Sequence, residues 1–187
     1  MRKVSIEDVG PGTVATDADR RGLTAPLGTT DVALSQYRLD PGERFSGGLP
    51  AHFDQEEVFV VVEGEATFET LDGEIVVGAG EAIRVAPGEF QSGRNDSDGE
   101  VVAFALGAPR DTNDVRVPIP CPECGHESTC PMMDESVGGA VLICPDCGAT
   151  TEVECPDCGS DRKRAVLADD GETVLDVCLD CGAETAV

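Results

Sequence analysis

Residues 41–64 read PGERFSGGLPAHFDQEEVFVVVEG. The stretch combines a Pro-Gly turn, two polar side chains, His52 and Glu57, and an unbroken apolar run from Val58 to Val62. An apolar run of this length between turn residues predicts a buried β-strand. Because His52 is one of only two histidines in the chain, we expect any chemistry in this part of the protein to occur here.

The neighbouring sequence predicts more short strands. From residue 31 onward, apolar and alternating runs recur with Gly, Asp and Pro turns between them, which is typical of an antiparallel all-β fold. The expected strands are 32–39, 57–62, 65–70, 74–78, 82–86 and 101–106. Asp72-Gly73 predicts a tight hairpin, and an extended arm at 1–29 is expected to contain one short strand at 4–6. About 80 residues of short strands can close a small barrel that holds one small ligand.

Two stretches carry a resemblance to a known family. Residues 41–64 resemble the first motif of the cupins, small antiparallel β-barrels (double-stranded β-helices) in which a His-x-His pair and a Glu bind a metal. The spacing from Glu57 to Gly64 fits this motif, and residues 80–95, GEAIRVAPGEFQSGRN, resemble the second one. The resemblance covers about residues 30–107, and it implies a cupin-like barrel.

The chain differs from the cupin motifs at two metal-binding positions. Pro50 stands at the first His position, His52 at the second, and Gln91 stands where the second motif has its His. The resemblance therefore implies a barrel site made of His52, Glu57 and Gln91. It is either a polar barrel mouth without metal or a weak divalent-metal site completed by Gln91 or water, because borderline metals depend on several imidazoles for their affinity.

Eight of the nine cysteines form an internal repeat. CPECG at 121–125 recurs 34 residues later at 155–159 as CPDCG, and CPDCG at 144–148 recurs at 178–182 as CLDCG. Each copy is Cys-x2-Cys, 19 residues and a second Cys-x2-Cys. The expected metal ligands are Cys121, Cys124, Cys144 and Cys147 in the first copy and Cys155, Cys158, Cys178 and Cys181 in the second.

Both copies resemble zinc ribbons, in which two such turns joined by a β-hairpin hold one structural zinc ion. The spacers supply the hairpins, with turns at Gly138-Gly139 and Asp169-Asp170-Gly171. A unit of about 34 residues buries too little apolar surface to fold alone, whereas structural zinc contributes about 10–16 kcal/mol of apparent binding energy. We therefore expect two zinc ions per chain. The alternatives are disulfides, iron in a rubredoxin-like site, and a pairing of the two central Cys-x2-Cys motifs.

The cysteines also divide the chain. Residues 1–115 are expected to form the barrel with its N-terminal arm, 116–152 the first ribbon and 153–187 the second. Residues 108–120, which contain three prolines, are expected to link the barrel to the ribbons. The predicted fold class is all-β: a cupin-like antiparallel β-barrel followed by two small zinc-ribbon β-hairpin domains.

Acidic residues are in excess throughout the chain. The formal net charge is −24, with −13 in residues 1–115 and −11 in residues 116–187, so the excess is not confined to one binding patch. This pattern indicates adaptation to salt, as in halophilic archaea, because a Debye length of about 3 Å in molar salt screens the self-repulsion. An acidic protein that mimics nucleic acid or binds basic partners is the alternative.

The N-terminus has no apolar core of signal-peptide length, and no apolar run approaches the length of a membrane span. Closely paired thiols are typical of metal ligands in a reducing compartment. We therefore expect a cytoplasmic protein that does not enter membranes.

The sequence contains no catalytic triad in a known order, no phosphate-binding loop and no nucleotide-binding motif, so no single function is indicated. We therefore consider three functions of different classes. The first is a regulatory or binding module, whose barrel holds a small molecule and whose ribbons dock on a protein partner; loss of two expected ligands favours it. The second is a metal-dependent cupin oxidoreductase or isomerase that uses His52 and Glu57. The third is a nucleic-acid-associated regulator, which the net charge disfavours because Arg162-Lys163-Arg164 is the only basic cluster in the ribbons. The resemblance also implies a homodimer paired through the barrel sheets.

Overall fold

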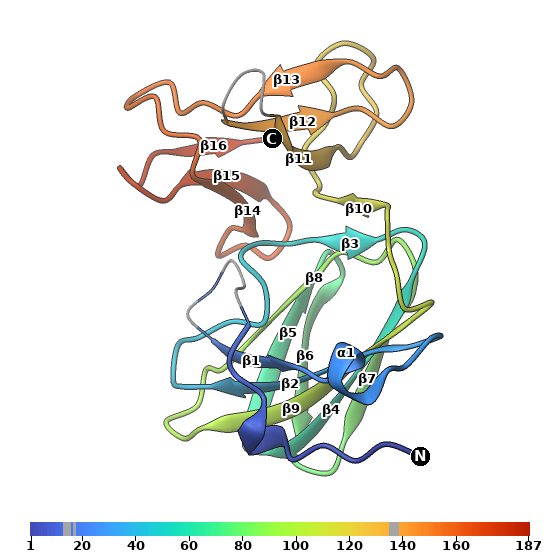
Figure 1. Cartoon of the computed structure of the whole chain (residues 1–187). Helices are drawn as coiled ribbons and strands as arrows, with labels where there is room; N and C mark the ends of the chain where they lie inside the picture. The colour runs from blue at the N-terminus through green and yellow to red at the C-terminus, as the bar shows by residue number, and fades with distance from the viewer. Residues whose placement is uncertain (13–15, 17, 135–138) are drawn as a thin grey trace.

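The computed structural model describes residues 1–12, 16, 18–134 and 139–187, and nearly all of its regular structure is β-strand (Figure 1). In chain order the elements are η1 (Ile6–Asp8), β1 (Asp19–Gly22), α1 (Thr24–Leu27), β2 (Ala33–Leu39), β3 (Ala51–His52), β4 (Glu56–Glu63), β5 (Glu65–Thr70), β6 (Gly73–Gly78), β7 (Ala82–Val85), β8 (Gln91–Arg94), β9 (Val101–Ala108), β10 (Val115–Arg116), β11 (Cys130–Asp134), β12 (Gly139–Ile143), β13 (Thr150–Glu152), β14 (Lys163–Leu167), β15 (Val174–Cys178) and β16 (Glu184–Ala186). The predicted all-β fold class is confirmed. Within the described part of the chain, every helix falls short of the length and apolarity that a membrane span requires.

The barrel is built from two antiparallel sheets. One has the order β1-β2-β9-β4-β7, and the other has the order β6-β5-β8. The apolar run of residues 58–62 lies in β4, which is hydrogen-bonded on both sides, to β9 and to β7. Within the run, Phe59 and Val61 are buried and Val62 is 48% exposed, so one face of β4 points into the core and the other is partly open to water. The predicted hairpin joins β5 to β6, and Gly73 provides the positive φ (+121°) that the turn needs.

An aromatic cluster fills the barrel interior. The ring of Phe45 lies 5.1 Å from that of Tyr37, 5.3 Å from that of Phe59 and 5.6 Å from that of Phe68, all measured between centroids. Close packing explains a glycine in β8, because a Cβ atom on Gly93 would lie 2.6 Å from Phe45 and 2.7 Å from Phe68. Glu57 precedes Phe59 by two residues and shares its face of β4, so the polar site borders this cluster.

The N-terminal arm is more structured than the sequence predicts. The strand expected at residues 4–6 is wrong, because the 3-10 turn η1 begins at Ile6. The arm also contributes β1, which pairs with β2, and a short helix, α1, that ends at Gly28 with φ +69°. Its charged sequence DRRG gives no strand pattern, so backbone pairing with β2 decides its conformation.

Each ribbon is a three-stranded antiparallel sheet, β11-β12-β13 in the first and β14-β15-β16 in the second. The two predicted hairpins are present, although Gly138 of the first turn lies outside the described residues. The third strand of each sheet was not predicted. Figure 1 shows the ribbons together at one end of the barrel, with β3 and β10 between them and the barrel strands.

The predicted link at residues 108–120 is not a free tether. It begins in β9, and Val115 and Arg116 form β10, which pairs with β3. The expected boundary between residues 115 and 116 therefore falls inside β10.

Candidate functional site

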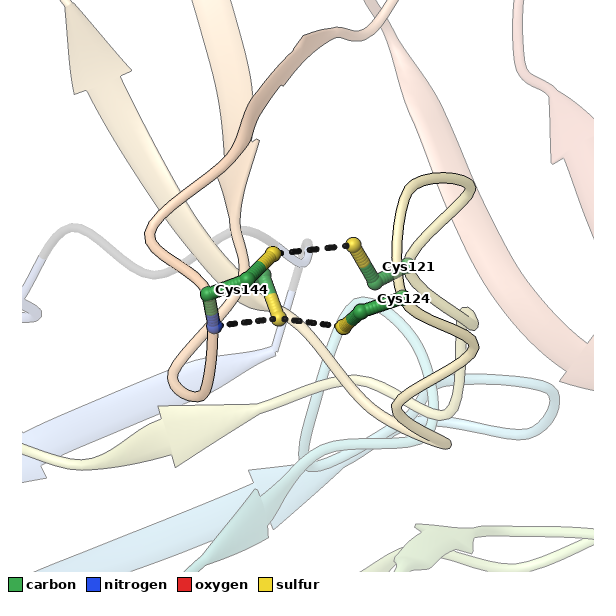
Figure 2. Close-up of side chains that lie close together, drawn as sticks. Cys121, Cys124 and Cys144 are labelled. Carbon is green, nitrogen blue, oxygen red and sulfur yellow. Dashed lines mark hydrogen bonds between the residues drawn. The ribbon is translucent and has the colours of Figure 1, made fainter.

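The eight predicted ligand cysteines meet in two clusters of four. In each cluster the sulfur atoms lie within 4.8 Å of one another. Among residues 1–12, 16, 18–134 and 139–187, no other group of three or more His, Cys, Asp or Glu side chains has its potential ligand atoms this close together. The Sγ–Sγ distances are 3.7 Å for Cys121–Cys147 and 3.6 Å for Cys124–Cys144, and 3.5 and 3.6 Å for their counterparts. A tetrahedral zinc ion with Zn–S bonds of about 2.3 Å places its sulfurs about 3.8 Å apart. Both clusters therefore fit a four-thiolate metal ion, and Figure 2 shows Cys121, Cys124 and Cys144 facing one another from two loops.

The turn after each Cys-x2-Cys pair explains this geometry. The glycines Gly125, Gly148, Gly159 and Gly182 all have φ between +72° and +75°, and each donates its N–H to the carbonyl of the first cysteine of its pair. A side chain at this φ would be strained, so glycine is the residue that lets the two thiols converge. The backbone N–H of Cys147 lowers the pKa of Cys144 to about 6, and that of Cys181 does the same for Cys178. A lowered thiol pKa favours the thiolate that binds metal. Although a backbone hydrogen bond lowers it, the pKa of Cys124 and of Cys158 is raised instead, to about 12, because hydrogen bonds with neighbouring thiols outweigh that effect, so the lowered pKa applies to one thiol of each cluster.

Inside the barrel, the structure brings His52, Glu57 and Gln91 together. The Nε2 atom of His52 lies 3.7 Å from Oε2 of Glu57, whose side chain is 17% exposed. Burial raises the pKa of Glu57, while the charge of His52 and a hydrogen bond from Gln91 oppose that rise. The predicted site residues thus share one environment, and their function stays a prediction.

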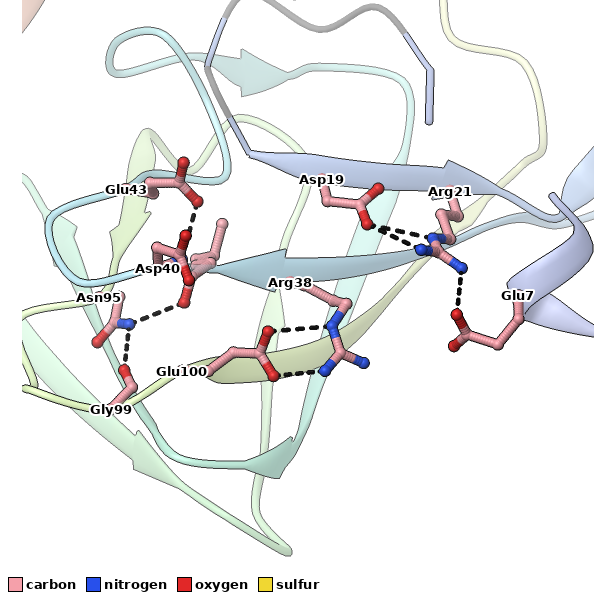
Figure 3. A network of polar contacts seen from close by, with 10 residues as sticks. Glu7, Asp19, Arg21, Arg38, Asp40, Glu43, Asn95, Gly99 and Glu100 are labelled. Carbon is pink, nitrogen blue, oxygen red and sulfur yellow. Dashed lines mark hydrogen bonds and ion pairs between the residues drawn. The ribbon is translucent and has the colours of Figure 1, made fainter. Parts of the chain in front are cut away.

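A fourth polar residue of this site, Arg20, was not predicted. It faces Tyr37 across the β1–β2 pair, with its guanidinium 5.8 Å from the ring centroid, and its charge acts on Glu57. The Nε atom of Arg20 is buried and has no hydrogen-bond partner within the described residues. Figure 3 shows the adjacent Arg21, whose guanidinium donates to Asp19 within β1 and to Glu7 of η1, so it connects η1 to β1. Strands are predicted from apolar or alternating runs, and the sequence of β1, DRRG, contains no such run.

Residues 112–117, which we call the strap, cover His52. The hydroxyl of Thr112 lies 3.2 Å from Nδ1 of His52 and donates to Asp54 Oδ1 at 2.5 Å. The amide of Asn113 donates to the other oxygen of Asp54 at 2.8 Å. These bonds fix the strap over the imidazole, so only one ring nitrogen of His52 faces Glu57.

The strap is also tied to the first ribbon. Val117 and Thr129 exchange two backbone hydrogen bonds, of 2.9 and 3.1 Å, and the thiol of Cys130 contacts Asp114 at 3.8 Å. At the barrel end, the guanidinium of Arg116 lies 3.8 Å from the ring centroid of Phe53. One segment therefore connects the His52 site with the first cysteine cluster.

A cavity of about 360 Å³ lies between β7 and the β6-β5-β8 sheet. Gln91 lines it together with apolar side chains that include Phe68, Ile83, Val85 and Phe90. Gln91 is only 5% exposed, and its Oε1 atom has no hydrogen-bond partner in the described part of the chain. An unpaired buried acceptor costs free energy, so a donor that reached this atom would bind favourably.

The barrel residues do not fit the metal site that the cupin motifs imply. His52 and Glu57 are two potential metal ligands, and Gln91 offers only a side-chain amide. Pro50 has no ligating side chain, and its backbone carbonyl accepts a hydrogen bond from the backbone N–H of Gln91 at 3.1 Å. Two strong ligands are too few for tight binding of a borderline metal.

The basic cluster of the second ribbon is largely neutralised. Arg162 pairs with Asp180, and Lys163 pairs with Asp176. Paired cations of this kind offer little attraction to a phosphate backbone.

Comparison with known proteins agrees with this architecture. Residues 35–107 match the family model described as "Cupin domain", and no curated protein matches the chain. A cupin-superfamily sugar phosphate isomerase from Silicibacter pomeroyi is 16% identical, with a TM-score of 0.53 over 98% of this chain and 92% of that one. A polyketide cyclase from Streptomyces resistomycificus is 23% identical, with a TM-score of 0.54 over 66% and 89%. A double-stranded β-helix protein from Klebsiella pneumoniae is 18% identical, with a TM-score of 0.50 over 60% and 94%. The barrel of this chain therefore has the cupin fold, and residues 35–107 are similar to the cupin domain model.

Proposed function

We propose that the barrel binds a small organic molecule without a tightly held metal, and that the ribbons are zinc-stabilised modules that dock on a partner protein. The observation that carries the barrel proposal is Gln91. It lines the cavity of about 360 Å³, and its Oε1 atom lacks a partner within the described residues. A molecule with an apolar body and a hydroxyl or amine group would match the aromatic lining and supply the missing donor.

The zinc proposal rests on the two closed four-cysteine clusters. Four thiolates leave no open position for a substrate, so each ion has a structural role. Iron would accept the same four ligands, and elemental analysis distinguishes the two metals.

A metal-dependent enzyme is the second candidate, and the environment of Glu57 favours it. Burial raises the pKa of this carboxyl, which is what a general acid-base residue needs near neutral pH. The isomerase and the cyclase among the structural neighbours suggest such an activity only by analogy.

The barrel proposal is tested by restoring the missing imidazoles. In the full chain with its cysteine clusters loaded, we expect the native barrel to bind Mn²⁺ or Ni²⁺ weakly in isothermal titration calorimetry. The Pro50→His/Gln91→His variant should bind the metal at least about tenfold more tightly for each added imidazole. Gln91→Leu is the control, because it changes the same position without adding an imidazole and should not strengthen metal binding. Tight stoichiometric binding in the native barrel that is lost in His52→Ala would contradict the proposal and favour the enzyme.

We also propose that the protein is cytoplasmic, because its closely paired thiols are typical of metal ligands in a reducing compartment. We propose that it is adapted to high salt, because both parts of the chain carry the acidic excess. Its thermal unfolding midpoint should rise between about 0.1 M and 2 M KCl as the repulsion is screened. A midpoint that stays constant or falls would contradict this adaptation.

A further inference from the structure

A cleft of about 240 Å³ lies between the two ribbons, and we call it the ribbon cleft. Its walls are mainly apolar and come from both copies of the repeat, with Met132, Val141 and Leu142 from the first and Ala165 from the second. The ribbons meet at Asp161, whose carboxylate accepts the amide hydrogen of Ala140 at 3.3 Å. The cleft therefore exists only because the two zinc-ribbon units pack together.

The rim of the ribbon cleft exposes two large apolar side chains. Met132 is 54% exposed and Met133 is 73% exposed, although both are in an ordered strand, β11. Methionine is flexible and polarisable, and it is common at surfaces that accept apolar side chains of a partner. A volume of about 240 Å³ is below the range of about 300–1,000 Å³ for small-molecule sites, so it suits a single inserted side chain.

Polar groups of the ribbon cleft lack partners. Lys163 pairs with one oxygen of Asp176, but the other oxygen, Oδ1, is buried without a hydrogen-bond partner within the described residues. The Nε atom of Arg164 is in the same situation. Both atoms are buried from solvent, so neither is a free hydrogen-bonding group for a ligand, and recognition in the cleft depends on its apolar walls and on nearby exposed charges.

A second cavity, of about 270 Å³, adjoins the ribbon cleft and is acidic. The two cavities share Ala140, Val153 and Asp161 in their walls, and Glu152 and Glu154 line the second one. Neither glutamate has an ion-pair partner among the residues that the structure describes. An apolar subsite beside an unneutralised acidic subsite is complementary to an apolar side chain beside a basic one.

We propose that the ribbon cleft binds a segment of a partner protein in which an apolar side chain is next to Lys or Arg. The inference rests on the proposed docking function of the ribbons and specifies its site and its chemistry. The apolar side chain fills the ribbon cleft, and the cation lies against Glu152 and Glu154.

The test uses the full metal-loaded chain and blocked, fluorescein-labelled peptides with a Leu-Lys-Lys core between Gly-Ser flanks. Peptides with Ser-Lys-Lys and Leu-Glu-Glu cores are the ligand controls. In fluorescence anisotropy at about 0.15 M KCl, the Ser-Lys-Lys peptide should bind about tenfold more weakly because it buries no apolar side chain. The Leu-Glu-Glu peptide should not bind measurably, because like charges face each other.

Matched protein variants locate the binding. Met132→Ser/Met133→Ser should weaken the Leu-Lys-Lys peptide more than Leu179→Ser, which changes another exposed apolar residue (46%) outside the cleft. Glu152→Gln/Glu154→Gln should weaken it about two- to fivefold, and more than the charge-matched Glu123→Gln/Glu184→Gln. Each variant is checked for an unchanged metal content, which shows that its ribbons are folded.

Equal affinity for the Leu and Ser peptides, or no binding of either, would overturn the proposal. Binding that the cleft variants do not weaken would also overturn it, while leaving the ribbons as a docking module with another site. The barrel proposal is independent of all these outcomes, because no barrel residue is changed.

Discussion

The fold shifts the protonation of Glu57, the carboxylate of the candidate barrel site. Burial raises its pKa above the ordinary value of about 4.5, so the neutral form is favoured in the folded protein. The stability that this preference gives is fully present below the pKa that Glu57 has in the unfolded chain. It is lost as the pH rises through the higher pKa that Glu57 has in the folded protein.

The variant Glu57→Gln is therefore expected to gain stability relative to the native protein as the pH rises. Urea unfolding between about pH 4 and pH 8 measures the difference, which should be small at the acidic end and grow above about pH 4.5 before it levels off. Glu65→Gln, an exposed residue, is the control. A difference for Glu57→Gln that does not change with pH would contradict the raised pKa.

Gly93 offers a test of the core. An alanine Cβ would lie within 2.7 Å of both Phe45 and Phe68, so Gly93→Ala should destabilise the barrel by about 1–3 kcal/mol through overpacking. Gly99→Ala is the matched control, because its Cβ would meet no atom within 4 Å. Chemical denaturation measures both, and equal stability of the two variants would show that the aromatic cluster is loosely packed.

The candidate barrel site could be predicted from the sequence only in part. The cupin-like motifs predicted His52, Glu57 and Gln91 as site residues, because residues at fixed positions of these motifs lie close together in the folded barrel. Arg20 could not be predicted, since its approach depends on the pairing of β1 with β2 and its neighbours are charged.

At the scale of elements, the strap connects the barrel site to the first cysteine cluster. Its hydrogen bonds to Asp54 belong to the barrel, and those between Val117 and Thr129 belong to the first ribbon. Because a ribbon of this size depends on its metal to fold, loss of that metal should remove one of the two attachments of the strap.

We expect Cys144→Ser to raise hydrogen exchange in residues 112–117 by about tenfold or more, as measured by mass spectrometry. The equivalent change in the second ribbon, Cys178→Ser, is the control and should leave the strap protected. Equal exchange in the two variants would mean that the barrel alone holds the strap.

Sequence patterns predicted the strands that carry apolar or alternating runs, such as β4 and β5. They did not predict β3, β8 or β10, which are two to four residues long and polar in part. These short strands form because their backbone groups pair with distant parts of the chain, β3 with β10 and β8 with β5, which no local pattern predicts.

At the scale of the whole molecule, the cysteine repeat predicted two ribbons but not their arrangement. Their contact depends on Asp161 and Ala140, which lie in different copies, and the ribbon cleft follows from it. Contacts between units are set by tertiary packing, so a repeat in the sequence indicates the units and not the surface between them.

The central claim is that the metal of this protein belongs to the ribbons and not to the barrel. Elemental analysis of the full chain should give about two zinc ions per chain, the same number in His52→Ala, and about one in Cys144→Ser and in Cys178→Ser. A third metal ion that disappears in His52→Ala, or fewer than about 1.5 ions per native chain, would contradict the account.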